Sequence, residues 1–230
     1  MHNGILVVNK PRGMTSHDVV DLVRRKLGVR KVGHAGTLDP EATGVLVVLV
    51  GSCTRLFDTF LSYDKEYVAT LTLGTKTSSG DAAGRVLDTR DYSHVREETA
   101  AGVMRTYVGE IMQTPPMVSA LKHKGKRLYK LARQGKDVER TPRKVNIKEL
   151  KLLNFSLPEI RFYLKCSRGT YVRQLAEDIA ADLGCVGHVS SIERVSIGPF
   201  DLKSCVSLED IEASKIRPFY KTGAVPCFSR

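Results

Sequence analysis

Residues 33–46 read GHAGTLDPEATGVL, and this stretch places one carboxylate, Asp39, in a turn built from small and turn-forming residues. Pro40 fixes its own φ and disfavours a helical conformation at Asp39. Glycines such as Gly36 allow the backbone to approach a bulky neighbour closely. The apolar run at residues 45–50 is typical of a buried strand. A carboxylate on a strand-rooted loop is suited to be a nucleophile, although Asp-Pro also begins many ordinary turns.

Strand patterns predominate along the rest of the chain. Strands are expected at residues 4–8, 67–73, 107–112, 145–155, 160–167 and 186–197, with a polar loop at 75–84 after which residues 85–87 resume the sheet. Helices are expected at residues 15–27, 54–61, 96–106, 128–133, 172–183 and 208–213. Because strands outnumber a simple βαβ alternation, we expect an α+β fold, with a central mixed, mostly antiparallel sheet flanked by helices and loops.

Composition narrows the class of protein. The chain has 230 residues, of which 42% are hydrophobic, but no apolar run is long enough to cross a bilayer. The amino terminus lacks a signal-peptide layout, so we expect a soluble cytoplasmic protein without a membrane partner. The five cysteines are dispersed without a CxxC pair and the six histidines form no HExxH pattern, which favours reduced thiols and no metal.

The net charge of +11 is concentrated in one window. Residues 122–151 contain twelve Lys or Arg and three Asp or Glu, which gives +9 of the +11. Such a cluster is suited to phosphates and favours a polyanionic partner, although a solvated helix face is the alternative. One aromatic residue in it is able to stack on a base. The candidate RNA-binding residues are Lys122, Lys124, Lys126, Arg127, Tyr129, Lys130 and Arg133.

Five segments, in this order along the chain, resemble the TruB family of tRNA pseudouridine synthases. They are NKPRGMTS at residues 9–16, the Asp39 stretch, KEY at 65–67, TPPMVSALKHKGKRLYKLARQG at 114–135, and residues 166–200 with GTYVRQL and GCVGHVSSIERVSIGPF. One match by chance is credible, but five are not. The resemblance implies the pseudouridine synthase fold and the isomerisation of uridine to pseudouridine in the T loop of tRNA, at position 55.

The same resemblance implies roles for single residues. Asp39 is the expected nucleophile, acting at C1′ or through a glycal, and Arg173 is expected beside it to keep it ionised. Tyr67 is expected to pack on the uracil and is a candidate for moving the proton from C5. Tyr171 and Ile192 match positions that line the base pocket, where many members carry Leu in place of Ile192.

The resemblance also predicts how the substrate is bound. The target nucleotide must be flipped out of the folded loop, and His34 is expected near that region without a part in proton transfer. Residues 9–16 are expected to buttress the catalytic loop. Because the reaction conserves atoms and oxidises nothing, no cofactor is expected. The segment at residues 114–135 matches the part that grips the tRNA T arm, which argues against a guide RNA; we expect a monomer.

Most members of the family continue into a PUA domain, whereas the last family-like motif here ends near Phe200 and the chain ends at Arg230. We therefore expect a catalytic domain at residues 1–213, with the basic segment 114–151 inside it, a tail at 214–230, no PUA domain and weakened tRNA binding. Two other interpretations stay open: a non-catalytic tRNA-binding or folding module of the same fold, and a guide-RNA-dependent catalytic subunit.

Overall fold

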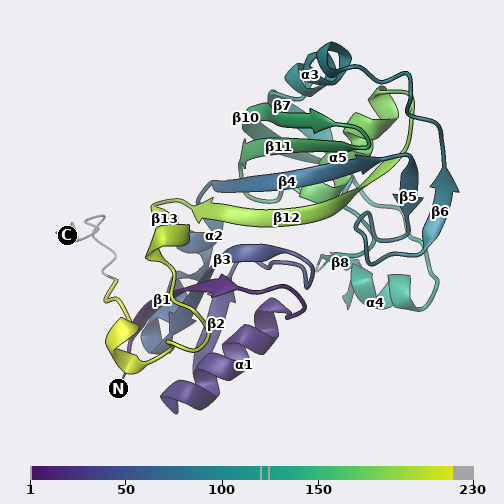
Figure 1. The fold of residues 1–230 in the computed structure, drawn as a ribbon. Helices are drawn as coiled ribbons and strands as arrows, with labels where there is room; N and C mark the ends of the chain where they lie inside the picture. Colours follow the sequence, from purple (N-terminus) through teal and green to yellow (C-terminus); the bar gives the residue numbers. More distant parts are fainter. Residues whose placement is uncertain (1, 120, 124, 220–230) are drawn as a thin grey trace. The chain divides into compact units, whose positions relative to one another are not determined.

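The computed structural model describes residues 2–119, 121–123 and 125–219, and it has the α+β architecture that the sequence predicts (Figure 1). The chain divides into two compact units, one formed by Met1–Lys65 with Glu193–Arg230 and the other by Glu66–Ile192. Strand β12 (Gly187–Ile197) runs from the second unit into the first.

The first unit is organised around β3. Its strands and helices are β1 (Gly4–Lys10), α1 (Ser16–Leu27), β2 (Val32–Ala35), β3 (Thr43–Val50), η1 (Gly51–Leu56), α2 (Phe57–Ser62), β13 (Phe200–Asp201), η2 (Leu202–Ser204) and η3 (Ala213–Lys215). Strand β1 pairs antiparallel with β3 along its whole length. The other edge of β3 is shared, because β2 pairs antiparallel with its second half and β12 pairs parallel with its beginning. The chain between β2 and β3 therefore leaves the sheet where β2 stops and β12 starts.

Apolar side chains of β1, β3 and the neighbouring elements form the core of this unit. Its buried members are Ile5, Val7, Ala35, Val45, Val47, Leu49, Phe60, Ile197 and Phe200. The ring of Phe60 lies 6.0 Å from that of Phe200 in a stacked arrangement. A rigid core directly below β3 gives the loop before β3 a firm base.

Helix α1 follows local sequence signals closely. Thr15 accepts a hydrogen bond from the Asp18 backbone N–H, and the Asp18 carboxylate accepts from the Thr15 N–H, which together form a capping box. Gly28 ends the helix in the left-handed conformation, with φ of 63°. The helix expected at residues 15–27 is confirmed.

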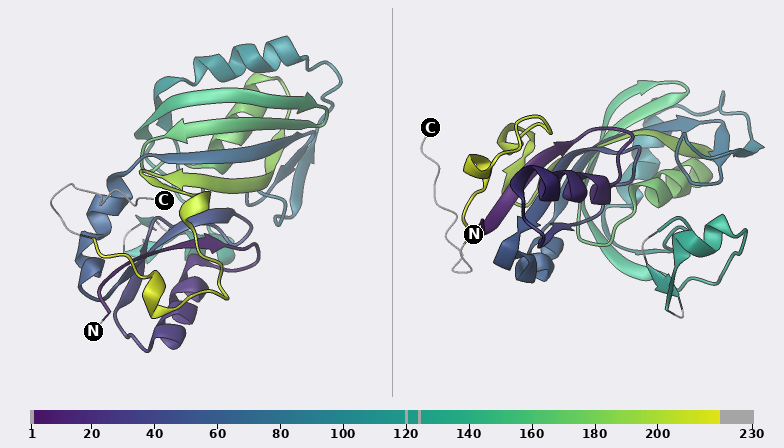
Figure 2. Two further views of the ribbon diagram at one scale, coloured as in Figure 1. Left: turned by 60° about the vertical axis from the view of Figure 1, so that its left-hand side comes forward. Right: turned by 90° about the horizontal axis from the view of Figure 1, so that it is seen from below.

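The second unit contains the larger set of strands. Its elements are β4 (Lys65–Leu73), β5 (Thr75–Thr77), β6 (Val86–Thr89), α3 (Glu97–Thr106), β7 (Gly109–Gln113), β8 (Lys122–His123), β9 (Lys126–Arg127), α4 (Leu128–Arg133), β10 (Arg143–Ser156), β11 (Glu159–Cys166), α5 (Val172–Asp182) and the beginning of β12. The sheet order is β12-β4-β11-β10-β7, and the pairs β5-β6 and β8-β9 are separate. Figure 2 shows α5 against one face of this sheet.

Alternation along the strands determines which side chains lie under α5. In β4 every second residue is buried, from Tyr67 through Leu73. Helix α5, expected at residues 172–183, buries an apolar stripe, since Leu175, Ala176 and Ile179 are all buried. The strands expected at residues 145–155 and 160–167 are confirmed as β10 and β11, which pair antiparallel with each other.

Two sequence predictions are wrong. Residues 85–87 do not resume the main sheet, because β6 pairs in a separate hairpin with β5, which lies in the segment expected to be a loop. Residues 208–213 do not form a helix. That segment is bounded by backbone pairing with β1, where Asn9 donates to Val206 O at 3.0 Å and Ile5 donates to Arg217 O at 2.9 Å. Strand β2 was absent from the predicted elements.

Four of the cysteines, Cys53, Cys166, Cys185 and Cys205, are free thiols, while Cys227 and most of the expected tail lie outside the described residues. None of the helices formed by the described residues is long and apolar enough to cross a membrane.

Candidate active site

Asp39 lies in the loop of residues 36–42 between β2 and β3. The Ala42 backbone N–H donates to Asp39 O at 3.1 Å, which closes a tight turn with Pro40 in its second position. Leu38 and Ala42 are buried on either side, whereas Asp39 is only partly buried. The loop is thus anchored by two apolar residues, with the carboxylate between them.

The segment that follows β1 fastens this loop, as the sequence predicted. Gly13 N–H donates to Pro40 O at 2.9 Å, and Lys10 Nζ donates to the same oxygen at 3.3 Å. Arg12 Nε donates to the Glu41 carboxylate at 2.7 Å. The end of β1 and the loop that follows it therefore hold Pro40 and Glu41, the two residues directly after Asp39.

Ser16 fixes the residue directly before Asp39. Its hydroxyl donates to Leu38 O at 3.0 Å and accepts from the Leu38 N–H at 2.8 Å, in a buried position. Both polar groups of one peptide residue are thereby satisfied by a single side chain. Ser16 is also the first residue of α1, so the capped start of that helix positions the hydroxyl.

Lys10 is a buried cation beneath the loop. Besides Pro40 O, its ammonium donates to Met14 O at 2.7 Å and to Pro11 O at 2.9 Å. Burial lowers its pKa to about 8, an effect that the negative charge of Asp39 opposes and the positive charge of Arg194 reinforces. The three carbonyl oxygens match the three donors of the ammonium group.

Arg194 in β12 is a second buried cation, and sequence reasoning missed it. Its side chain donates from Nε to Val45 O at 2.8 Å, from Nη2 to Gly36 O at 3.0 Å and from Nη1 to Thr37 O at 3.5 Å. The only sequence signal is its position in a predicted strand, two residues after Ile192 and so on the same strand face.

His34 lies in β2, shortly before the loop. Its Nδ1 is buried and has no hydrogen-bond partner among the described residues. Burial, assisted by the positive charges of Arg194 and His17, lowers its pKa to about 4. His34 is therefore a neutral imidazole at physiological pH.

The second unit carries the other residues that the sequence singled out. Tyr67 is buried in β4, and Ile192 is half-buried at the end of this unit. Tyr171 directly precedes α5, and its peptide is gripped by a side chain that sequence reasoning missed. Gln113, which is 2% exposed, donates to Tyr171 O at 3.1 Å and accepts from Tyr171 N–H at 2.8 Å. No periodic pattern marks such a buried amide.

Arg173 follows on the first turn of α5 and is 3% exposed, so it is not a solvent-facing helix arginine. Its guanidinium donates to Val118 O at 2.8 Å and to Ser79 O, and its Nε lies 3.9 Å from an Asp81 carboxylate oxygen. Asp39 and His34 belong to the first unit, and Tyr67, Tyr171, Arg173 and Ile192 belong to the second. Their meeting around one uridine stays a prediction.

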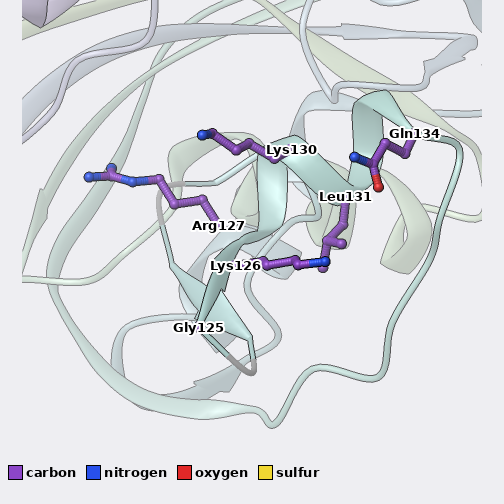
Figure 3. A pocket seen from close by; sticks show the side chains of 6 residues that line it. All are labelled: Gly125, Lys126, Arg127, Lys130, Leu131 and Gln134. Carbon is purple, nitrogen blue, oxygen red and sulfur yellow. The ribbon is translucent and has the colours of Figure 1, made fainter.

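The basic segment forms a small hairpin, β8-β9, followed directly by α4. Lys126, Arg127 and Lys130 are exposed and, with Gly125, Leu131 and Gln134, line a pocket of about 430 Å³ (Figure 3). Tyr129 is half-buried, and its N–H donates to Ser119 O at 3.1 Å. Lys124 and the side chains of Lys122 and Arg133 lie outside the described residues.

The remaining basic residues of the predicted window lie elsewhere, mainly on β10. Several of them are paired: Lys144 lies 2.7 Å from Glu110, and Lys151 pairs with Glu149. The charge of residues 122–151 is therefore divided between the hairpin-helix segment, where the described cations line an open pocket, and a strand on which acids neutralise part of it.

Comparison with known families agrees with this architecture. Residues 24–172 match the family model described as TruB family pseudouridylate synthase (N terminal domain). Residues 173–219 match the model described as tRNA pseudouridylate synthase B C-terminal domain, so family similarity extends beyond Phe200.

Curated relatives are similar over most of the chain. A tRNA pseudouridine synthase B of Syntrophotalea carbinolica is 50% identical over 210 residues, which cover 91% of this chain and 69% of the relative. A tRNA pseudouridine synthase B of Pelotomaculum thermopropionicum is 48% identical over 217 residues, which cover 92% of this chain and 69% of the relative.

Among solved structures, a chain of a Cbf5-Nop10-Gar1 complex superposes with a TM-score of 0.74 at 28% identity, covering 94% of this chain and 60% of that chain. A chain of an H/ACA RNP bound to a substrate RNA containing 2′-deoxyuridine gives a TM-score of 0.67 at 28% identity, covering 90% and 51%. This chain thus spans less than two thirds of those structures, which share its pseudouridine synthase fold. The family models and the curated relatives together decide the matter: the chain belongs to the TruB family of tRNA pseudouridylate synthases and is an enzyme of that class.

Proposed function

We propose that this chain converts uridine to pseudouridine at position 55, in the T loop of tRNA, with Asp39 as the nucleophile. The observation that carries the proposal is the fixed backbone on both sides of Asp39. Ser16 holds Leu38 and Lys10 holds Pro40, while Asp39 between them is only partly buried. A nucleophile needs such a combination of a rigid support and an accessible side chain.

The proposed reaction is balanced without a cofactor. The N1–C1′ bond breaks, the uracil turns, and a C5–C1′ bond forms, while C5 loses a proton and N1 gains one. Asp39 acts either on C1′ or by removing the C2′ proton to form a glycal. The nucleotide is flipped out of the loop so that the carboxylate reaches its ribose.

Residues of the second unit are proposed to hold the base and the nucleophile. Tyr67 and Ile192 retain the detached uracil, Tyr171 lines the same pocket, and the Tyr67 hydroxyl is the candidate for moving the C5 proton. Arg173 is proposed to pair with Asp39 and favour its ionised form. Neutral His34 contacts the flipped-out region or fills space there.

Binding of the T arm is proposed to rest on the basic hairpin-helix segment, by contacts with the backbone phosphates. The set is Lys122, Lys124, Lys126, Arg127, Tyr129, Lys130 and Arg133. A monomer acting in the cytoplasm without a guide RNA, with a catalytic domain at residues 1–213, completes the proposal.

Release of tritium from a tRNA transcript labelled at uridine C5 tests this function. Wild type should release tritium from a transcript that has labelled uridine at position 55. It should release none from a control transcript that has cytidine at position 55 and labelled uridines elsewhere. Asp39→Asn should bind the same tRNA and release none. A well-folded wild type that binds tRNA without release would instead favour the non-catalytic tRNA-binding or folding module. Release that appears only with an added guide RNA and partner proteins would favour the guide-dependent subunit.

A further inference from the structure

Arg194 touches both ends of the loop that carries Asp39. The Gly36 and Thr37 carbonyls lie where β2 ends and the loop begins, and the Val45 carbonyl lies in β3, beyond the end of the loop. The guanidinium is planar and presents its donors in a fixed fork, so it sets the separation of these two backbone segments more rigidly than a flexible ammonium would. We propose that Arg194 is a positioning residue for the isomerisation, holding the Asp39 loop in its reactive conformation.

The backbone around Arg194 is itself fixed. Arg194 pairs with Gly44 in the parallel register of β12 and β3. At Gly36, where φ is +87°, an added Cβ would lie 3.6 Å from Nη1 of Arg194. Glycines thus flank the loop on both sides and lie next to Arg194. Gly36 lies next to its guanidinium, whereas Gly44, in β3, lies next to its backbone, where a Cβ would be 2.3 Å from the Arg194 carbonyl oxygen.

The surroundings of Arg194 separate this role from that of an ordinary structural ion pair. The side chain is 1% exposed, and all of its hydrogen bonds among the described residues go to backbone carbonyls. Lys10, below the same loop, likewise donates to carbonyls. Neither cation has a carboxylate in an ion pair within the described part of the chain, and burying two such charges is costly for stability. Both side chains donate hydrogen bonds to the loop that carries Asp39, and the negative charge of Asp39 attracts Lys10.

The inference rests on the proposed nucleophile and makes a kinetic distinction. Loss of a residue that only stabilises the fold lowers the fraction of folded enzyme. Loss of a positioning residue lowers the rate at which the folded enzyme reacts with tRNA that it has already bound. A displacement of about 1 Å in a reacting group costs about 100-fold in rate. Binding of the T arm does not depend on the loop conformation in this scheme, so the loss should fall on the chemical step and leave tRNA affinity unchanged.

The experiment compares Arg194→Lys and Arg194→Met with wild type in single-turnover tritium release under saturating enzyme, together with the Kd for tRNA and the Tm. Lys keeps the charge but not the fork, and Met keeps only bulk. Arg24→Met is the matched control, because Arg24 Nη2 also donates to a backbone carbonyl of this unit, Val32 O, at 2.8 Å, at the far end of β2. Asp39→Asn provides the reference for the proposed nucleophile.

We expect folded Arg194→Lys to react about 100-fold more slowly than wild type, Arg194→Met more slowly still, and both to bind tRNA within about threefold of wild type, with Arg24→Met at the wild-type rate. Wild-type rates in either folded Arg194 variant, or a loss matched by Arg24→Met, would overturn the proposal. Failure of both Arg194 variants to fold would also overturn it, by assigning the residue to stability. Retained release by Asp39→Asn would refute the proposed nucleophile independently of the result at Arg194.

Discussion

Arg194 and Gly44 face each other in the parallel pairing of β12 with β3, so closely that a Cβ on Gly44 would lie 2.3 Å from the Arg194 carbonyl oxygen. Gly44 also has a φ of +100°, a conformation that residues with side chains rarely adopt. Gly44, the second residue of β3, is therefore required to be glycine for two reasons: the close approach of β12 and its own backbone conformation.

This contact predicts a large difference between two glycines of the same motif. Gly44→Ala should lower the free energy of unfolding by more than about 3 kcal/mol, because the backbone of β12 has to move and the new residue is strained. Gly33→Ala is the matched control, since its Cβ would meet only Thr54, at 3.9 Å, and should change stability by less than about 1 kcal/mol. Urea unfolding measures both, and equal effects would contradict this account of the close approach.

Ser16→Ala should weaken the support of Asp39 from the other side. It leaves the N–H and C=O of Leu38 buried without their partner, which costs about 2 kcal/mol, and it frees the residue before the nucleophile. We expect a lower Tm and a lower kcat at unchanged tRNA affinity. Ser62→Ala, which removes an exposed hydroxyl bonded to Thr59 O, is the control and should leave kcat unaltered. A Ser16 variant with wild-type kcat would show that the loop keeps its conformation without this clamp.

Gln113→Met should disturb the base pocket through Tyr171. The buried amide satisfies both backbone groups of Tyr171, and methionine of similar volume satisfies neither, so we expect a loss of about 2 kcal/mol in stability. If Tyr171 lines the pocket, kcat also falls, because the residue is no longer held at the start of α5. Gln174→Met, which loses a part-buried hydrogen bond to Asp178 within α5, is the control. Unfolding and single-turnover rates measured on both variants test the two parts separately.

Local signals explain what the sequence could predict. Thr15, Asp18 and Gly28 determine α1 through bonds within a few residues, so its bounds were predictable without tertiary structure. Strand β2 was not, because its four residues include Gly33 and His34 and its conformation depends on pairing with β3. The same reason applies to the failed helix at residues 208–213, whose apolar spacing is overridden by pairing of the flanking residues with β1.

The candidate site likewise contains features that local sequence signals mark and features that depend on tertiary structure. The turn at Asp39 and the segment that buttresses it were predictable because turn-forming residues and a motif mark them in sequence. The roles of Arg194 and Gln113 depend on burial of a polar side chain against backbone groups more than 50 residues away. A single sequence contains no periodic pattern that marks such contacts, because a buried arginine and an exposed arginine within a strand cannot be distinguished from sequence alone.

His34 should make stability depend on pH below neutrality. Its pKa in the folded chain is lowered to about 4, from an ordinary value of 6.5, by burial and by the charges of Arg194 and His17. Between these values the unfolded state binds a proton that the folded state does not, so stability falls as pH falls through 6.5 towards 4. Relative to His34→Gln, wild type should lose about 2 kcal/mol more between pH 7 and pH 4.5. Urea unfolding at intervals of half a pH unit measures this difference, and the two proteins should show parallel stability above pH 7. Parallel curves at low pH as well would mean that His34 accepts its proton in the folded chain as readily as in the unfolded one.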